Sequence, residues 1–308
     1  MPSVGLAITG LTTAVLVISF FRHKRAPLPA YGGVGMIALL AAKCLLLGGF
    51  RPVAIYFTPV AWTCYILLAD AAVFAIRGRS RLHNPRQFAS LAALSVPLWL
   101  VFEAYNLRLN NWTYTGLPQA WPLAILGYGW SFATITPGIV ETADLIESFG
   151  WFHPATPLRF SARTERGMMF FGALCLIIPL TVPQTLAAHL FVLVWIGFVF
   201  LLDPLNYGHG LPSLLGELAE GRRELFYSLL ASGFVCGWLW EFWNYWAAAK
   251  WHYIFPMFQS WKIFEMPAPG YLGFLPFALE CFVMYVTAAR LLRFPQLEPI
   301  EPRGMGGR

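Results

Sequence analysis

The sequence predicts an all-α fold, a polytopic transmembrane helix bundle of about nine helices. Of its 308 residues 58% are hydrophobic and only 12% are charged, and the mean hydropathy is +0.60. Soluble domains carry roughly twice that fraction of charged residues, so a single water-soluble core would lack the charge to cover its surface. Apolar runs of bilayer-spanning length recur along the chain, and basic residues gather between alternate runs.

Each expected helix is an apolar run of roughly 17–25 residues, the length that crosses a bilayer. The nine runs are expected at about 4–21, 32–50, 52–76, 88–106, 122–148, 167–183, 185–202, 226–249 and 268–289. The first run has its basic residues after the apolar stretch and no evident cleavage site, so we expect a retained anchor and not a signal peptide.

The basic residues predict the orientation of these helices. With the N-terminus outside, sixteen of the 21 Lys and Arg fall on the cytoplasmic side, and only Arg51, Arg108, Lys250 and Lys262 fall outside. Lys and Arg favour cytoplasmic loops. We therefore expect a multi-pass protein of the cell inner (cytoplasmic) membrane with a cytoplasmic C-terminus. The formal charge of +6 is then topological, and no nucleic-acid partner is expected.

Two stretches of the chain resemble each other. "FEAYNLRLNNWTY" (102–114) matches "WEFWNYWAAAKWHY" (240–253): Glu103 and Asn106 each lie 138 residues before Glu241 and Asn244, and Trp112 and Tyr114 lie 139 residues before Trp251 and Tyr253. The offset of 139 continues to Pro137 with Glu141 and Pro276 with Glu280. Upstream, Asp70 resembles Asp203. The order Asp, E-x-x-N, W-x-Y and P-x-x-x-E thus occurs twice.

The duplication predicts how the chain is organised. Each unit covers four helices, and an even number of helices makes the two repeats parallel, related by an axis along the membrane normal. We expect an N-terminal transmembrane anchor helix in residues 1–30, a first four-helix repeat in 31–150, a second four-helix repeat in 151–292, and a disordered cytoplasmic tail in 293–308.

The paired polar residues are the candidate catalytic groups: Glu103, Asn106, Glu141, Glu241, Asn244 and Glu280. An ionisable group within a span is costly and marks a functional site by default. On a helix, E-x-x-N places carboxyl and amide on one face, close enough to share a proton or a ligand. We also expect Glu280 to neighbour Glu241, with Asn244 orienting its partner. The structural alternative is interhelical hydrogen bonding that holds the two halves together.

The aromatic residues allow two interpretations as well. Trp112, Tyr114, Trp251 and Tyr253 follow helices that exit to the outer face, where Trp and Tyr form interfacial belts, and for these four the belt interpretation is favoured. Trp240 and Trp243 lie deeper. Inward-facing rings among all six would bind a long apolar substrate or stabilise a cation.

The duplicated pattern resembles the membrane-embedded lycopene cyclase-type repeats of bacteria, archaea and fungi. The resemblance rests on a carboxylate or amide pair, then W-x-Y, then proline followed by glutamate, over about 100–141 and 237–281. That family shows adjacent acids at +2 and +3 after the proline, whereas Glu141 and Glu280 stand at +4 here. The resemblance implies redox-neutral cyclisation of a polyene isoprenoid: an acid protonates a terminal double bond, the cation closes a ring, and a base removes a proton.

Such chemistry needs a carboxylic acid kept protonated by apolar surroundings, a nearby acceptor and rings around the cation, without metal or nucleotide. We therefore expect a carotenoid or terpenoid cyclase or isomerase whose partners are the lipid bilayer and a membrane lipid or isoprenoid substrate, with no cofactor and no metal. The competing classes are a proton-coupled transporter or lipid-binding membrane protein that uses the same carboxylates, and a structural partner without chemistry.

Overall fold

The computed structural model describes residues 1–300, and within them nine helical segments are long and apolar enough to span a membrane, as the sequence predicts. The spanning segments are α1 (Pro2–His23), α2 (Ala30–Leu47), α4 (Phe57–Arg77), α5 (Pro85–Leu109), α6 (Trp121–Ala133) with α7 (Ile135–Ser148), α8 (Ala162–Thr181), α10 (Phe191–Gly208), α12 (Glu224–Trp246), and η2 (Ala268–Gly273) with α13 (Phe274–Leu292). The shorter elements are α3 (Arg51–Ile55), η1 (Arg81–His83), α9 (Gln184–Ala187), α11 (Leu214–Ala219), β1 (Trp112–Thr115), β2 (Lys250–Tyr253), β3 (Lys262–Ile263) and β4 (Met266–Pro267). The all-α class is therefore confirmed.

Two of the expected spans differ in detail from the structure. The fifth is broken at Thr134 into α6 and α7, and Pro137, which has no N–H to donate, lies in the first turn after the break. The seventh was expected at 185–202 but begins at Phe191, because Pro183 ends the preceding helical path and the short α9 intervenes.

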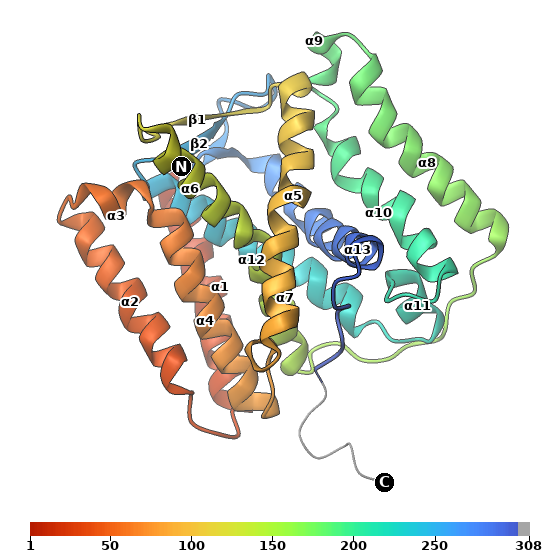
Figure 1. Ribbon diagram of the computed structural model, residues 1–308, viewed down its shortest axis with the longest axis horizontal. Helices are drawn as coiled ribbons and strands as arrows, with labels where there is room; N and C mark the ends of the chain where they lie inside the picture. The colour runs from red at the N-terminus through yellow and green to blue at the C-terminus, as the bar shows by residue number, and fades with distance from the viewer. Residues whose placement is uncertain (301–308) are drawn as a thin grey trace.

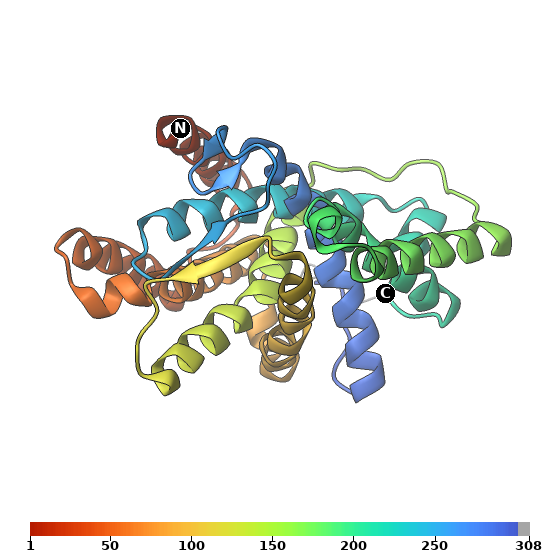
Figure 2. The same cartoon turned by 90° about the horizontal axis from the view of Figure 1, so that it is seen from above.

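Burial divides the helices into an inner and an outer set. More than half of the residues of α4, α7, α12 and α13 are buried, whereas α1, α2 and α8 bury few and expose many large apolar side chains. Helices α2 and α4 lie together on one side and α8 and α10 on the other, with α13 between the two sides (Figures 1 and 2). Exposed apolar outer helices are what a lipid-surrounded bundle requires.

Met1 and the segment that follows α13 up to Ile300 lie at opposite ends of the bundle. The N-terminal amine of Met1 donates to the carbonyl oxygen of Lys262 at 2.5 Å, at the end that carries the strands. There β1 and β2 pair antiparallel, with Trp112 opposite Tyr253 and Tyr114 opposite Trp251. The sequence analysis did not predict these strands.

The segment after α13 packs against the end of the bundle far from the strands. The backbone oxygens of Pro295, Gln296, Glu298 and Ile300 accept hydrogen bonds from the side chains of Tyr285, Gln87, Arg81 and Arg77. Leu297 is buried. The expectation of a disordered tail is therefore wrong for residues 293–300, and its remainder, 301–308, lies outside the described residues.

We predict that Gly172→Ala destabilises the pair formed by α8 and α10. A Cβ at Gly172 would lie 2.4 Å from the backbone nitrogen of Leu201 and 2.7 Å from the carbonyl oxygen of Gly197, and neither backbone can move without moving α10. Overpacking of this kind costs about 1–3 kcal/mol. Gly167→Ala is the matched control on the same helix, because a Cβ there meets nothing within 4 Å. Unfolding midpoints in detergent should fall for Gly172→Ala only.

Candidate active site

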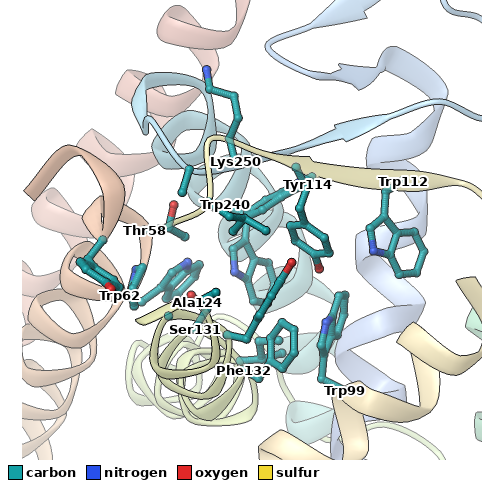
Figure 3. A pocket seen from close by; sticks show the side chains of 18 of the residues that line it. Thr58, Trp62, Trp99, Trp112, Tyr114, Ala124, Ser131, Phe132, Trp240 and Lys250 are labelled. Carbon is teal, nitrogen blue, oxygen red and sulfur yellow. The ribbon is translucent and has the colours of Figure 1, made fainter. Parts of the chain in front are cut away.

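A cavity lined mainly by aromatic side chains lies beneath β1 and β2, between α4, α6, α12 and α13 (Figure 3). The volume of the cavity is about 130 Å³. A single water needs roughly 10–15 Å³ on the same measure, so the cavity can hold a larger ligand. The lining includes Trp62, Trp99, Trp112, Trp195, Trp240, Trp251, Tyr56, Tyr114, Tyr128, Tyr253, Phe132, Phe191, Phe274 and Phe277.

Glu103 lies directly behind this aromatic wall. One oxygen, Oε1, accepts three hydrogen bonds: from Trp99 Nε1 at 2.8 Å, from Trp112 Nε1 at 3.2 Å and from the Tyr114 hydroxyl at 2.5 Å. All three donors belong to rings that line the cavity. The carboxyl group is thus separated from the cavity by the side chains that it holds in place.

Glu241 makes the corresponding arrangement in the second half of the chain. Its Oε1 accepts from Trp251 Nε1 at 3.3 Å and from the Tyr253 hydroxyl at 3.0 Å. The residue is fully buried, and Oε2 has no hydrogen-bond partner among the described residues. This oxygen is the position at which the carboxyl group would carry a proton, because no donor competes for it.

Both tyrosine hydroxyls remain protonated near neutral pH. Burial raises the pKa of Tyr253 and of Tyr114 well above the ordinary value, and the adjoining carboxyl groups of Glu241 and Glu103 raise each pKa further. Each hydroxyl therefore has one hydrogen to donate, and in the structure it donates to the carboxyl group. A Glu–Tyr pair of this kind can pass a proton between the buried acid and the cavity.

Asn106 and Asn244 do not hydrogen-bond to the glutamates, so the expected orienting role is wrong. The Asn244 side chain donates to the carbonyl oxygen of Trp251 and accepts from its backbone N–H, at 2.9 and 3.0 Å. Asn106 does the same to Trp112, at 2.9 and 3.1 Å. In both halves of the chain, E-x-x-N places the glutamate and the asparagine on one face of the helix. The asparagine amide bonds to the backbone of the strand tryptophan, and the glutamate carboxyl group accepts from the indole N–H of the same tryptophan.

Five of the six expected substrate-binding residues line the cavity: Trp112, Tyr114, Trp240, Trp251 and Tyr253. Trp243 does not; its ring packs edge-on against Trp62, with centroids 4.7 Å apart. The polar atoms of the four strand residues point to the carboxyl groups of Glu103 and Glu241, which favours the cavity interpretation over the interfacial belt.

Glu280 lies far from Glu241, so the expectation that they are neighbours is wrong. In the antiparallel pair α12–α13, Gly233 lies against Phe274 and Ala278. Along α12, Glu241 lies eight residues from this contact, toward the strand end of the bundle. Along α13, Glu280 lies about four residues from it toward the opposite end. At 1.5 Å per residue, the two glutamates are therefore roughly 15–20 Å apart along the helix axes. Glu280 instead faces the backbone of Phe198, fully buried and without a hydrogen-bond partner among the described residues.

Glu141 also lies away from the cavity, in a separate group with Asp70 on α4. The remaining acid of the duplicated pattern, Asp203, accepts hydrogen bonds from the backbone N–H groups of Leu214 and Leu215, at 2.7 and 2.9 Å. Asp203 therefore closes the loop before α11 and has a structural role.

The sequence analysis missed several cavity residues, of which Trp62 and Trp99 matter most. Trp99 precedes Glu103 by four residues, which places the two on one helical face, and this spacing was a usable signal. The sequence around Trp62 gives no such signal, because an aromatic residue on an apolar helix is indistinguishable from an ordinary core residue. Its ring lies 4.7 Å from that of Trp240, centroid to centroid.

Comparisons of this chain with family models, with curated proteins and with solved structures found no match.

We predict that Asn244→Ala loosens β2 and destabilises the protein by about 2–3 kcal/mol, since it removes two hydrogen bonds of about 1 kcal/mol each and leaves the backbone of Trp251 without its partners. Backbone amide exchange of Trp251 should accelerate with the loss of stability. Thr113→Ala, at an exposed position of β1, is the control. Unchanged exchange in Asn244→Ala would contradict this role.

Proposed function

We propose that the protein is an acid–base enzyme that cyclises or isomerises a polyene isoprenoid, a carotenoid or terpenoid lipid, without net oxidation or reduction. The observation that carries this proposal is that two tyrosine hydroxyls in the wall of this mainly apolar cavity, those of Tyr114 and Tyr253, are each bonded to a carboxyl group behind the wall. A cavity built this way suits an apolar ligand and offers it two sites of proton transfer.

The proposed reaction balances within these groups. Glu241, protonated on Oε2, turns this oxygen to Tyr253 and gives its proton to the tyrosine oxygen. The Tyr253 hydroxyl, which then no longer donates to Glu241, gives its own hydrogen to a double-bond carbon of the substrate. The resulting carbocation closes a ring by attack of a second double bond. Loss of a proton from a neighbouring carbon to Tyr114, and from its hydroxyl to Glu103, forms the new double bond, so that substrate and product have the same mass.

The aromatic wall has a role in this mechanism beyond apolar contact. The faces of Trp and Tyr rings stabilise a cation by about 0.5–2 kcal/mol each when water is excluded. Trp62, Trp99 and Trp240 contribute rings to the wall (Figure 3). The ammonium of Lys250, which would repel a cation, is directed away from the cavity and donates to the carbonyl oxygen of Tyr245 at 2.5 Å.

We also propose that the two halves arose by duplication and that the strand end of the bundle faces outward. The matching bonds of Glu103 and Glu241, the matching bonds of Asn106 and Asn244, and the reciprocal pairing of β1 with β2 support a two-fold relation. The excess of basic residues in the loops at the other end supports the orientation. Labelling of cysteines placed at the exposed Gln119 and Ser260 with an impermeant reagent should succeed from outside the cell.

The proposal is tested by producing the protein in a bacterial host that accumulates lycopene, and by separating the extracted pigments with mass detection. We expect a product of unchanged mass and altered absorption, because ring closure twists the end double bond of the polyene out of plane or moves it out of conjugation. A product that differs in mass from the substrate would contradict a redox-neutral isomerisation.

The alternative function, a transporter or lipid-binding protein, gives a different outcome in the same experiment. The cavity would then hold its ligand without altering it, so the polyene would co-purify with the protein in unchanged form. Co-purification without conversion, across several acyclic polyenes, would favour that alternative.

A further inference from the structure

A second polar group lies outside the proposed active site, between α4, α7 and η1. At its centre Glu141 is fully buried, and neither of its oxygens has a hydrogen-bond partner among the described residues. Asp70, which is also fully buried, is the acidic side chain nearest in effect to the Glu141 carboxyl group. Two carboxyl groups close together inside a protein do not both ionise, because burial and like charge each oppose it.

The hydrogen bonds around Asp70 decide which of the two carries the proton. Asp70 Oδ1 accepts from the hydroxyls of Tyr31 and Ser80, each at 2.7 Å, and Oδ2 accepts from the backbone N–H of Leu82 at 3.0 Å. Asp70 thus accepts three hydrogen bonds, whereas Glu141 accepts none from the described residues, so Glu141 has both oxygens free to carry the proton of the pair.

Within residues 1–300, the arginines near the pair are already engaged by other groups. Arg81, the nearest guanidinium, donates through Nε and Nη2 to Asp144, and through Nη1 to Gln87 and to the carbonyl oxygen of Glu298. Arg77 pairs with Glu147 at 3.2 Å. Each arginine of this group is therefore matched by its own carboxylate, and one proton held between Asp70 and Glu141 lowers the charge of that pair from −2 to −1.

A chain of hydrogen bonds connects this pair to the surface. Ser80 gives its hydroxyl hydrogen to Asp70, so its oxygen is left to accept from His83 Nδ1, 2.9 Å away. His83 is exposed, and its ring stacks on Phe74 with centroids 4.6 Å apart. Histidine exchanges protons readily near neutral pH, and an imidazole joined through a hydroxyl to a carboxylate is a complete path for a proton.

We propose that Glu141 and Asp70 form a proton-binding site that exchanges its proton with water at the end of the bundle opposite the cavity, through Ser80 and His83. The site is separate from the chemistry proposed for the cavity and does not depend on it. The titratable and charged groups that face it are Tyr31 from α2, Tyr65 and Arg77 from α4, Arg81 and His83 from η1, Asp144 and Glu147 from α7, and Cys236 from α12.

Infrared spectroscopy of the full-length protein, reconstituted in phosphatidylcholine–phosphatidylglycerol vesicles, tests the proposal without any substrate. A protonated carboxylic acid has a carbonyl stretch that shifts when the solvent is changed to D2O. We expect a rapidly exchanging component that disappears in Glu141→Gln. Glu280→Gln is the matched control: Glu280 is as buried and as unpartnered, but no acidic neighbour or hydrogen-bond chain leads to it. It should remove only a slowly exchanging component.

Two further variants test the path itself. Ser80→Ala and the exposed His83→Ala should keep the Glu141 component and slow its exchange with solvent about tenfold. Each substitution removes one hydrogen bond of the path, and a barrier higher by the free energy of about one hydrogen bond slows a rate about tenfold. The exchange rates of these two variants test the proton path even if Glu141→Gln fails to fold. Exchange at the wild-type rate in both variants overturns the proposed path. Survival of the rapid component in Glu141→Gln overturns the proton site. Loss of that component from the wild-type protein when N-methylglucamine is replaced by sodium ions also overturns it, because the site would then bind a metal cation.

Discussion

Turnover of the polyene is expected to fall by about 10²–10⁴-fold in Glu241→Gln, the range for loss of a general acid. Glutamine keeps the size of the side chain and an acceptor oxygen for Trp251 and Tyr253, but it has no proton to transfer. Tyr253→Phe should cause a loss of the same order, because it removes the hydroxyl between the acid and the cavity. Product formation in membranes, measured by chromatography, provides the rates.

The matched control for these variants is Tyr245→Phe. Tyr245 is on the same helix as Glu241, one residue after Asn244, but its ring packs on Phe264 and does not line the cavity. It should retain wild-type turnover. If Glu241→Gln and Tyr253→Phe are also fully active, the two Glu–Tyr pairs only hold the strands to the bundle, and the acid–base mechanism is wrong.

The largest expected loss of stability is in Arg81→Gln, at about 3–5 kcal/mol. Arg81 and Asp144 are both nearly inaccessible, and removing the guanidinium leaves Asp144 buried without its partner. It also releases Gln87 and the segment after α13. The midpoint of unfolding in a denaturing detergent titration should fall accordingly.

Arg222→Gln is the control for this prediction. Arg222 pairs with Glu217 at 2.7 Å on the surface, with 49% of its side chain exposed, and exposed pairs contribute about 0–1 kcal/mol. Adding Asp144→Leu to Arg81→Met should recover part of the stability, since no unpaired charge then remains. A similar loss in Arg81→Gln and Arg222→Gln would contradict the importance of the buried pair.

The number of spanning helices was predictable, because the length and hydropathy of a bilayer-spanning segment are properties of each segment alone. The helix breaks at Thr134 and near Pro183 were harder to predict, because an apolar run has the same composition and length whether the helix inside it is continuous or interrupted. The pairing of β1 with β2 joins residues 135 to 141 positions apart. A strand of four residues is also too short for its alternating pattern to be recognised in the sequence.

The sequence predicted most of the residues of the candidate site, but it did not predict which groups these residues bond to. Duplication pointed to Glu103, Asn106, Glu241 and Asn244, and these four do contact the matching W-x-Y residues. The period of two in a strand places Trp251 and Tyr253 on one face, which would have indicated a shared partner if the segment had been taken as a strand. The separation of Glu280 from Glu241 depends on the register of α12 against α13, which no local pattern encodes.

Solvent-deuterium incorporation tests the central claim most directly. With the purified protein reconstituted in vesicles in D2O and lycopene as the substrate, a proton delivered from the buried acid must derive from solvent. Each ring formed should then carry one deuterium at the protonated carbon, detected by mass spectrometry, and Tyr253→Phe should form little or no labelled product. A cyclised product without deuterium would contradict proton delivery by the Glu241–Tyr253 pair.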